Sequence, residues 1–211
     1  PRRDFLMKTL GYFSDPGVAF VQTPQDFYNL DSFQNRTDSG IHVAWSEQSL
    51  FFRVIQRGKD YWNAAFYCGS CAVIRRQSLD AVGGFATGTV TEDIHTSLLL
   101  HKKGYRSVYH DESLAYGVAP AKIEPFLKQR VRWGVGAMNV WRKEGILFTR
   151  GLTLAQRLNY LATVLAYFDG WQKAFFYFAP VYVLIAGAMP IAENGWVFLL
   201  HFVPYYLLNF L

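Results

Sequence analysis

Runs of hydrophobic residues along the chain predict helices and strands in alternation. Residues 5–13 carry apolar side chains at helical spacing and are followed by the turn Asp15-Pro16-Gly17. The short apolar run 18–21 predicts a buried strand, and further strands are expected at 71–76 and 106–110. Because helices and strands alternate, the pattern predicts an α/β fold in which helices cover a sheet.

Loops and helix ends are indicated by polar and glycine-rich positions. Residues 29–47 are polar and are expected to form a loop, and residues 83–84 a turn. Thr91 can cap a helix that runs to about Lys103, with Gly104 as its terminator.

A long helix is expected from about Pro125, and its two faces differ in composition. One face groups Gln129, Arg132, Trp133, Gly136 and Val140. The opposite face groups Leu127, Val131, Val135 and Met138. The apolar face is expected to pack on the core, while the first face suits a flat apolar partner or an interface.

The last third of the chain is strongly apolar. Residues 152–173 place leucines along one stripe, which predicts an amphipathic helix lying in a membrane interface. Two apolar runs follow at 174–192 and 195–211, and the first is long enough to cross a ~30 Å hydrocarbon core as a helix. The runs predict a transmembrane hairpin, and the alternative is a pair of buried core helices.

These patterns divide the chain into three parts: an α/β part over 1–150, an interfacial helix over 151–173 and a membrane hairpin over 174–211. Glu193 is the one charged residue of the short connection between the two apolar runs. Basic residues precede the first run, namely Arg142, Lys143, Arg150, Arg157 and Lys173. The positive-inside rule then places residues 1–173 in the cytoplasm of a multi-pass protein of the plasma (inner) membrane.

The net charge of the chain limits the classes of binding partner that the sequence predicts. The 211 residues carry a formal net charge of +5, and the basic residues are too dispersed to indicate nucleic-acid binding. This charge suits a membrane surface and an anionic substrate. The chain starts at Pro1, has no signal peptide and stops inside an apolar run, so we expect a piece of a longer protein.

The two cysteines, Cys68 and Cys71, are spaced C-x-x-C, as in redox and zinc sites. A redox pair needs its first cysteine at a helix N-terminus, whereas this pair leads into the β-favouring residues 72–74. A zinc site needs about four ligands, and a second C-x-x-C is missing. Two reduced thiols are therefore expected, with no metal.

Thr91, Glu92 and Asp93 place two acids at the start of a predicted helix. Acids in a first helical turn are ordinary helix-start chemistry, because they complement the helix dipole. The functional alternative is that Asp93 is a fixed general base that takes a proton from a hydroxyl nucleophile.

Arg132 and Trp133 combine a guanidinium with an indole on one helix face. The guanidinium suits bidentate contact with a phosphate, and the indole suits the flat apolar face of a pyranose ring. The alternative places Arg132 in a surface salt bridge and Trp133 in the core.

Taken together, these segments resemble the processive membrane glycosyltransferases of family two and, within them, the bacterial cellulose synthase catalytic subunits. Those proteins carry an FFCGS-like segment, a TED segment and a Q-x-x-R-W segment in this order, followed by interfacial and transmembrane helices. This chain has Phe66 through Ser70, then Thr91 through Asp93, then Gln129 through Trp133. VQTPQDFYN at 21–29 also looks like a VQTP segment of the family.

The resemblance implies a GT-A type fold, a UDP-sugar donor and a growing β-glucan acceptor. Under it, Asp93 within Thr91-Glu92-Asp93 is the general base, and Gln129 and Arg132 lie near the donor diphosphate. Trp133 is implied as the platform under the terminal sugar of the acceptor. Cys68, Gly69 and Ser70 are implied to form a turn beside that sugar.

The resemblance also implies a divalent metal, Mg2+ or Mn2+, held by a D-x-D motif upstream of a segment like PRRDFL. Asp4 is alone and is no substitute, so the chain by itself is expected to lack metal ligands and to be inactive. Other subunits of a synthase complex are expected partners. The alternatives are a synthase of another polymer (1,3- or mixed-linkage glucan, mannan or hyaluronan-like), or a non-catalytic polysaccharide-binding membrane protein.

Overall fold

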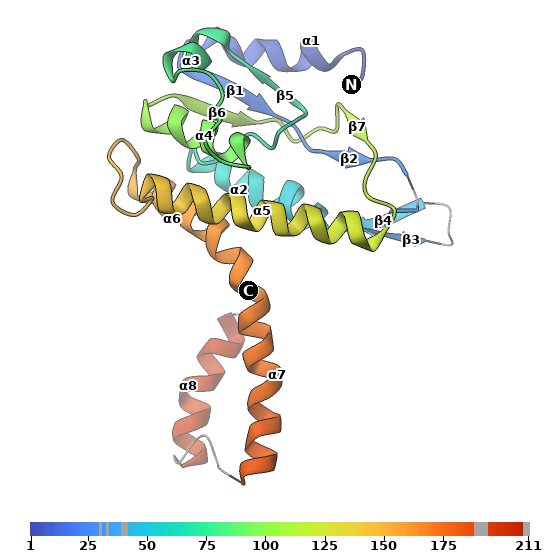
Figure 1. Cartoon of the computed structure of the whole chain (residues 1–211), viewed down its shortest axis with the longest axis vertical. Coiled ribbons are helices and arrows are strands. Elements are labelled where there is room, and N and C mark those ends of the chain that lie inside the picture. Colours follow the sequence, from blue (N-terminus) through green and yellow to red (C-terminus); the bar gives the residue numbers. More distant parts are fainter. Residues whose placement is uncertain (30, 33, 39–41, 188–193, 209–211) are drawn as a thin grey trace. The chain divides into compact units, whose positions relative to one another are not determined.

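The structure is a computed structural model that describes the chain except residues 30, 33, 39–41, 188–193 and 209–211 (Figure 1). It divides into two compact units, Pro1–Tyr167 and Phe168–Leu211. The first unit contains all the described strands, and the second contains two long helices. Each unit is considered by itself.

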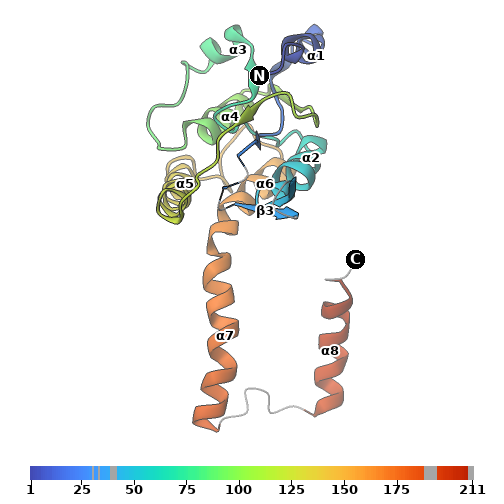
Figure 2. The ribbon, with the colours of Figure 1, turned by 90° about the vertical axis from the view of Figure 1, so that its right-hand side faces the viewer.

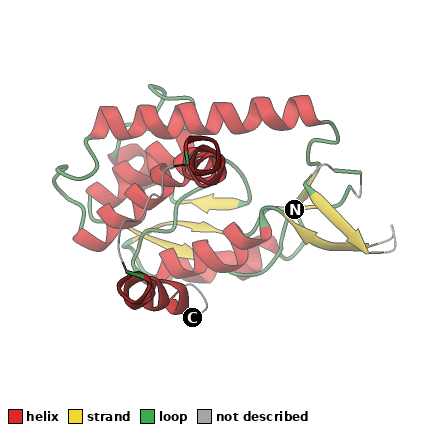
Figure 3. Cartoon of the chain, turned by 90° about the horizontal axis from the view of Figure 1, so that it is seen from below, coloured by secondary structure: helices red, strands yellow, loops and turns green. Residues whose placement is uncertain are grey.

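A three-stranded sheet is the centre of the first unit. Its order is β5 (Ala72–Ile74), β1 (Val18–Gln22) and β6 (Arg106–Tyr109), with β1 antiparallel to β5 and parallel to β6. All five residues of β1 are buried, which explains its unbroken apolar run. Helices flank these strands (Figure 3). The strands predicted at 18–21, 71–76 and 106–110 are confirmed.

Two small ribbons lie outside the central sheet. β2 (Asp26–Phe27) pairs in parallel with β7 (Tyr116–Gly117), and β3 (Asn35–Asp38) pairs antiparallel with β4 (His42–Ser46). The prediction that residues 29–47 form a loop is therefore wrong. The sequence of β3, Asn-Arg-Thr-Asp, has no alternation of apolar and polar residues, so the hairpin rests on backbone pairing that the hydrophobic pattern does not report.

The first helices are short and interrupted. The helix predicted at 5–13 is confirmed as α1 (Phe5–Thr9), which continues as the 3-10 turn η1 (Leu10–Ser14). A π-helical turn, η2 (Phe51–Ile55), leads directly into α2 (Gln56–Tyr61). After β5 the chain turns at once into α3 (Arg76–Ala81), so β5 is shorter than the predicted strand.

The helix α4 (Glu92–Lys102) ends where predicted, because Gly104 adopts the left-handed backbone with φ +85°. At its start Thr91 occupies the N-cap position, but its side chain makes no capping hydrogen bond. Capping by the Thr91 side chain is therefore not observed.

The long helix α5 (Ile123–Glu144) is confirmed, but the predicted orientation of its faces is wrong. Leu127, Val131 and Val135 are 52%, 66% and 50% exposed, whereas the buried positions are Gly136, Ala137 and Val140. Helix α5 packs through small residues, since a Cβ atom at Gly136 would lie 2.3 Å from Cγ2 of Thr91. Hydrophobicity alone does not identify a contact face made by glycine and alanine.

The main core of the first unit joins α4, α5 and α6 (Leu154–Leu165). It consists of Phe66, Leu98, Ala137, Val140, Ile146, Leu152, Tyr160 and Val164. The predicted single helix over 152–173 is wrong in extent, because α6 ends at Leu165 and the short turn η3 (Ala166–Phe168) follows. The α6 residues Leu154 and Leu158 are exposed, so part of the predicted stripe lies outside this core.

The second unit contains the helices α7 (Asp169–Ala186) and α8 (Gly195–Leu208) (Figure 2). Both helices are rich in exposed aromatic and aliphatic side chains. Within the described ranges, no helix combines the length and the apolar character needed to cross a membrane. The end of the predicted first span, 188–192, and the connecting Glu193 lie outside the described residues. The transmembrane hairpin therefore stays a prediction.

Candidate active site

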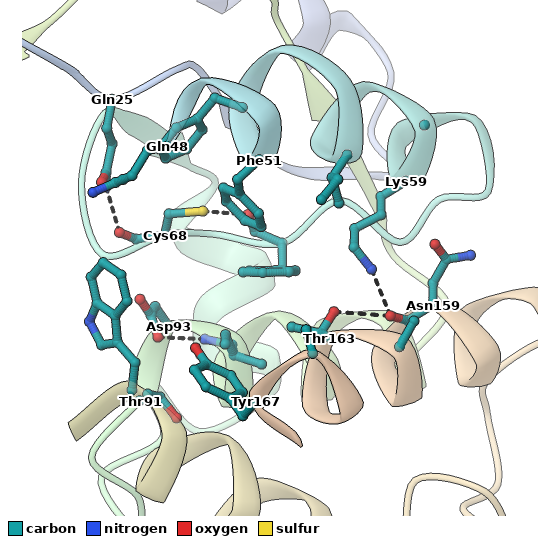
Figure 4. Close-up of a pocket in the computed structure, with 18 of the residues that line it drawn as sticks. Gln25, Gln48, Phe51, Lys59, Cys68, Thr91, Asp93, Asn159, Thr163 and Tyr167 are labelled. Carbon is teal, nitrogen blue, oxygen red and sulfur yellow. Dashed lines mark hydrogen bonds between the residues drawn. The ribbon is translucent and has the colours of Figure 1, made fainter. Parts of the chain in front are cut away.

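A cavity of about 640 Å³ opens in the first unit between α4, α5, α6 and the segment that leads from β4 into α2 (Figure 4). Polar and apolar side chains both line it. The lining includes Gln25, Glu47, Gln48, Phe51, Lys59, Phe66, Cys68, Thr91, Asp93, Arg130, Trp133, Asn159, Thr163 and Tyr167. Three of the segments singled out in the sequence therefore meet at one place.

Asp93 lies in the first turn of α4 and lines this cavity. Its Oδ1 accepts a hydrogen bond of 2.8 Å from the backbone N–H of Ile94. The pKa of Asp93 is raised to about 6: burial is the main cause and the charge of Glu92 adds to it, whereas the hydrogen bond from Ile94 and the charge of Arg132 lower the pKa. Above that pH the carboxylate is charged in a poorly solvated place, which makes it a better proton acceptor than an ordinary aspartate.

The other two residues of this segment behave differently from Asp93. Thr91 is 4% exposed and lines the cavity, and among the described residues its hydroxyl oxygen has no hydrogen-bond partner. Glu92 is exposed and is not a lining residue. Of the two acids, the geometry therefore favours Asp93 as the proton acceptor.

The turn Cys68-Gly69-Ser70 is held against the cavity by two glutamines. Gln22 Oε1 accepts from the Cys68 backbone N–H at 2.9 Å. Gln25 Nε2 donates to the Cys68 carbonyl at 2.6 Å and to Ser70 Oγ at 2.8 Å. The backbone of this turn is consequently fixed beside Asp93, since a Cβ atom at Gly69 would lie 3.3 Å from Asp93 Oδ2.

Both cysteines are free thiols. Burial raises the pKa of the Cys68 thiol well above its usual range, and Gln56 Nε2 donates to its sulfur at 3.1 Å. Cys71 has φ +56° and leads into β5 rather than into a helix. Neither thiol is therefore in the environment of a reactive redox cysteine.

Helix α5 contributes Trp133 to the cavity lining, together with Arg130. Arg132 is exposed and Gln129 is half-buried, and neither belongs to the lining. Arg132 nevertheless acts on Asp93 electrostatically, because its charge lowers the pKa of that carboxyl. The sequence patterns did not single out Arg130, although its spacing of three residues from Trp133 was visible.

The opposite end of the cavity contains Lys59, whose side chain is buried. Its Nζ donates to the Asn159 carbonyl at 2.6 Å, and burial lowers the pKa of Lys59 to about 8. This contact joins α2 to α6 (Figure 4). Lys59 is a second cavity residue that the sequence patterns missed.

The side chains that could bind a divalent metal are dispersed over the described part of the chain. Within that part, no group of three or more His, Cys, Asp or Glu side chains is placed to hold a metal ion.

The first unit has the fold of known glycosyltransferases. A mannosyltransferase from Pyrobaculum calidifontis, solved in complex with GDP-Man and Mn2+, matches 90% of this chain and 48% of its own chain with a TM-score of 0.65. At 19% sequence identity this likeness shows the fold, which is GT-A-like and mixed α/β. The expected α/β fold of the GT-A type is therefore confirmed, and the expected membrane helices stay a prediction.

Curated relatives are closer in sequence. Cellulose synthase 1 from Komagataeibacter xylinus is 38% identical over 206 residues, which are 97% of this chain and 13% of that protein. The UDP-forming cellulose synthase catalytic subunit from Pseudomonas fluorescens (strain SBW25) is also 38% identical over 97% of this chain, which covers 28% of that protein. The chain thus spans well under a third of these relatives.

The order of the three motifs and their meeting at one cavity agree with the match to a family model over residues 1–211. The resemblance seen in the sequence is confirmed: this chain belongs to glycosyl transferase family group 2.

Proposed function

We propose that this chain is part of a processive, inverting glycosyltransferase that adds sugar from a UDP-sugar to a growing β-glucan. UDP-glucose and cellulose are the proposed donor and product, because the curated relatives are named cellulose synthases and one is described as UDP-forming. The observation that carries the proposal is Asp93, a carboxyl with a pKa of about 6 in a cavity that it shares with Trp133 and Cys68.

In the proposed reaction, Asp93 accepts the proton of an acceptor hydroxyl as that oxygen attacks the anomeric carbon of the donor sugar. The bond from that carbon to the diphosphate breaks, and its electron pair leaves with UDP. Attack opposite the leaving group inverts the anomeric configuration. A base with a pKa of about 6 is mostly deprotonated at neutral pH and still holds a proton better than an ordinary aspartate.

The remaining residues are proposed to bind and orient the two substrates. Trp133 is proposed as the platform for the terminal sugar of the acceptor, since its indole lines the cavity that contains Asp93. The turn Cys68-Gly69-Ser70 would bound that sugar on its other side. Gln129 and Arg132 are proposed to hold the diphosphate, where the guanidinium stabilises the charge of the leaving group.

The intact enzyme is proposed to use Mg2+ or Mn2+ at the donor diphosphate, with ligands outside this chain. It is also proposed to be a multi-pass membrane protein with residues 1–173 in the cytoplasm. The basic residues before position 174 and the apolar sequence of α7 and α8 support that topology.

The test is sugar incorporation by the intact protein in membrane vesicles. Labelled UDP-glucose, UDP-N-acetylglucosamine and GDP-mannose would be supplied separately, with Mg2+ or Mn2+, and the product digested with an endo-β-1,4-glucanase. We expect label from UDP-glucose in a polymer that this glucanase degrades. A polymer that resists the enzyme, or one made from another donor, would identify a different synthase. Vesicles that incorporate none of the three sugars would contradict the proposal.

A further inference from the structure

Arg130 lies between two aromatic rings of its own helix. Its guanidinium carbon is 4.8 Å from the ring centroid of Phe126 and 4.7 Å from that of Trp133. These rings are four residues before and three residues after Arg130, so all three side chains share one face of α5. A guanidinium over an aromatic face is attracted by the ring quadrupole, which holds the two planes together.

A carboxylate from a distant segment fixes the same guanidinium. Glu47, the first residue after β4, forms an ion pair with Arg130. The backbone N–H of Glu47 donates to the Gln34 carbonyl at 3.0 Å, and Gln48 Nε2 donates to Gln34 Oε1 at 2.6 Å. The carboxylate therefore comes from an anchored turn near the N-terminal part of α5 (Figure 1).

The ion pair is too exposed to contribute much to stability. The side chains of Arg130 and Glu47 are 27% and 43% exposed, and pairs of this kind are screened by solvent. The ion pair instead restricts the orientation of the Arg130 guanidinium, because it contacts the group from a direction different from that of the two rings. Glu47, Arg130 and Trp133 all line the cavity that contains Asp93.

We propose that Arg130 is a positioning residue for the acceptor, which holds the Trp133 indole from one face and leaves the other face for the terminal sugar. This inference rests on the proposed function. Arg130 acts through Trp133, and Glu47 acts through Arg130. Loss of the stack lets the indole rotate, so the acceptor hydroxyl is less often within reach of Asp93, while the donor still binds.

The substitution Arg130→Met in the intact enzyme keeps an unbranched stem and removes the planar cation. We expect kcat to fall roughly 3- to 30-fold, the range for loss of one cation–aromatic contact, with the KM for UDP-glucose unchanged. More UDP should be released per glucose incorporated, because water replaces a misplaced acceptor, and the glucan chains should be shorter. Arg130→Lys keeps the charge but not the flat face and should give an intermediate loss.

Two further variants separate positioning from general damage. Arg142→Met removes an exposed arginine of the same helix and should leave all four quantities unchanged. Glu47→Gln should lower kcat less than Arg130→Met does, and it should add no further loss to Arg130→Met, because Glu47 acts only through Arg130. Glu47→Gln also provides the test if Arg130→Met does not fold.

The inference is overturned if Arg130→Met behaves like Arg142→Met, or if the Glu47 and Arg130 effects simply add. A raised KM for UDP-glucose in Arg130→Met also overturns it, since Arg130 would then contact the donor. Failure of the unaltered enzyme to incorporate any sugar would instead contradict the proposed function, so the two failures are distinguishable.

Discussion

Gly69 lies directly beside Asp93: a Cβ atom at position 69 would be 3.3 Å from Asp93 Oδ2. Gly69 also has φ +78°, a left-handed backbone that other residues adopt only with strain. Two segments separated by more than twenty residues thus meet at one carboxylate. The small size of residue 69 leaves Asp93 Oδ2 open toward the cavity.

This contact predicts the effect of Gly69→Ala in the intact enzyme. The left-handed backbone should cost about 1–2 kcal/mol of stability, and the added methyl should displace Asp93 and lower turnover roughly 10- to 100-fold. Gly84→Ala is the matched control, because Gly84 has φ +91° but no atom within 4 Å of an added Cβ. Thermal melts should shift alike, while polymer synthesis should fall only in Gly69→Ala. Equal activity in the two variants would show that the close approach of residue 69 to Asp93 does not affect turnover.

The raised pKa of Asp93 predicts a pH-dependent stability. Its carboxyl titrates near 3.8 in an unfolded chain and near 6 in the folded protein, so the folded state disfavours the ionised form. The contribution of Asp93 to stability is fully present below about pH 4 and is lost as pH rises through about 6. At pH 7.5, Asp93→Asn should therefore be more stable than the unaltered protein, by at most about 3 kcal/mol.

Denaturation of both proteins across pH 4 to 8 measures this difference. It should shrink steadily below pH 6 and vanish near pH 4. Glu92→Gln is the comparison: burial is the largest cause of the raised pKa of Asp93 and the Glu92 charge a smaller one, so removing that exposed charge should stabilise the protein at pH 7.5 less than Asp93→Asn does. An Asp93→Asn variant less stable than the unaltered protein at pH 7.5 would mean that the carboxylate is stabilised in the fold, contrary to its raised pKa.

The basic residues before position 174 predict which side of the membrane the connection between the apolar runs reaches. A reporter inserted between residues 193 and 194 of the intact protein should lie on the non-cytoplasmic side. A second reporter at the exposed Phe148 should lie in the cytoplasm. Cytoplasmic labelling of both reporters would remove the support for a membrane hairpin.

Parts of this fold could be predicted because single residues determine them. The buried strand β1 has no polar residue before Gln22, and the end of α4 follows from Gly104. The orientation of α5 could not be predicted in the same way, because Gly136 and Ala137 form its contact face. The pairing of β3 with β4 was missed because the residues of β3 show no alternation of apolar and polar side chains.

The candidate site was predictable at the level of motifs and less so at the level of contacts. Asp93, Trp133 and Cys68 line one cavity although they come from distant segments. Arg130 and Lys59 were missed, since their roles depend on partners brought close only by the fold. Helical spacing from Trp133 could have indicated Arg130, whereas nothing in the sequence near Lys59 indicates its burial.

The most direct test of the central claim is the turnover of Asp93→Asn in the intact enzyme. Asparagine keeps the size of the side chain but cannot accept the proton, and general base catalysis is typically worth about 10²–10⁴-fold. We predict that kcat for glucose incorporation falls by at least about that factor, while UDP-glucose binding is retained and Glu92→Gln stays active. Near-normal polymer synthesis by a folded Asp93→Asn enzyme would contradict the account, because Asp93 would then be only part of a helix start.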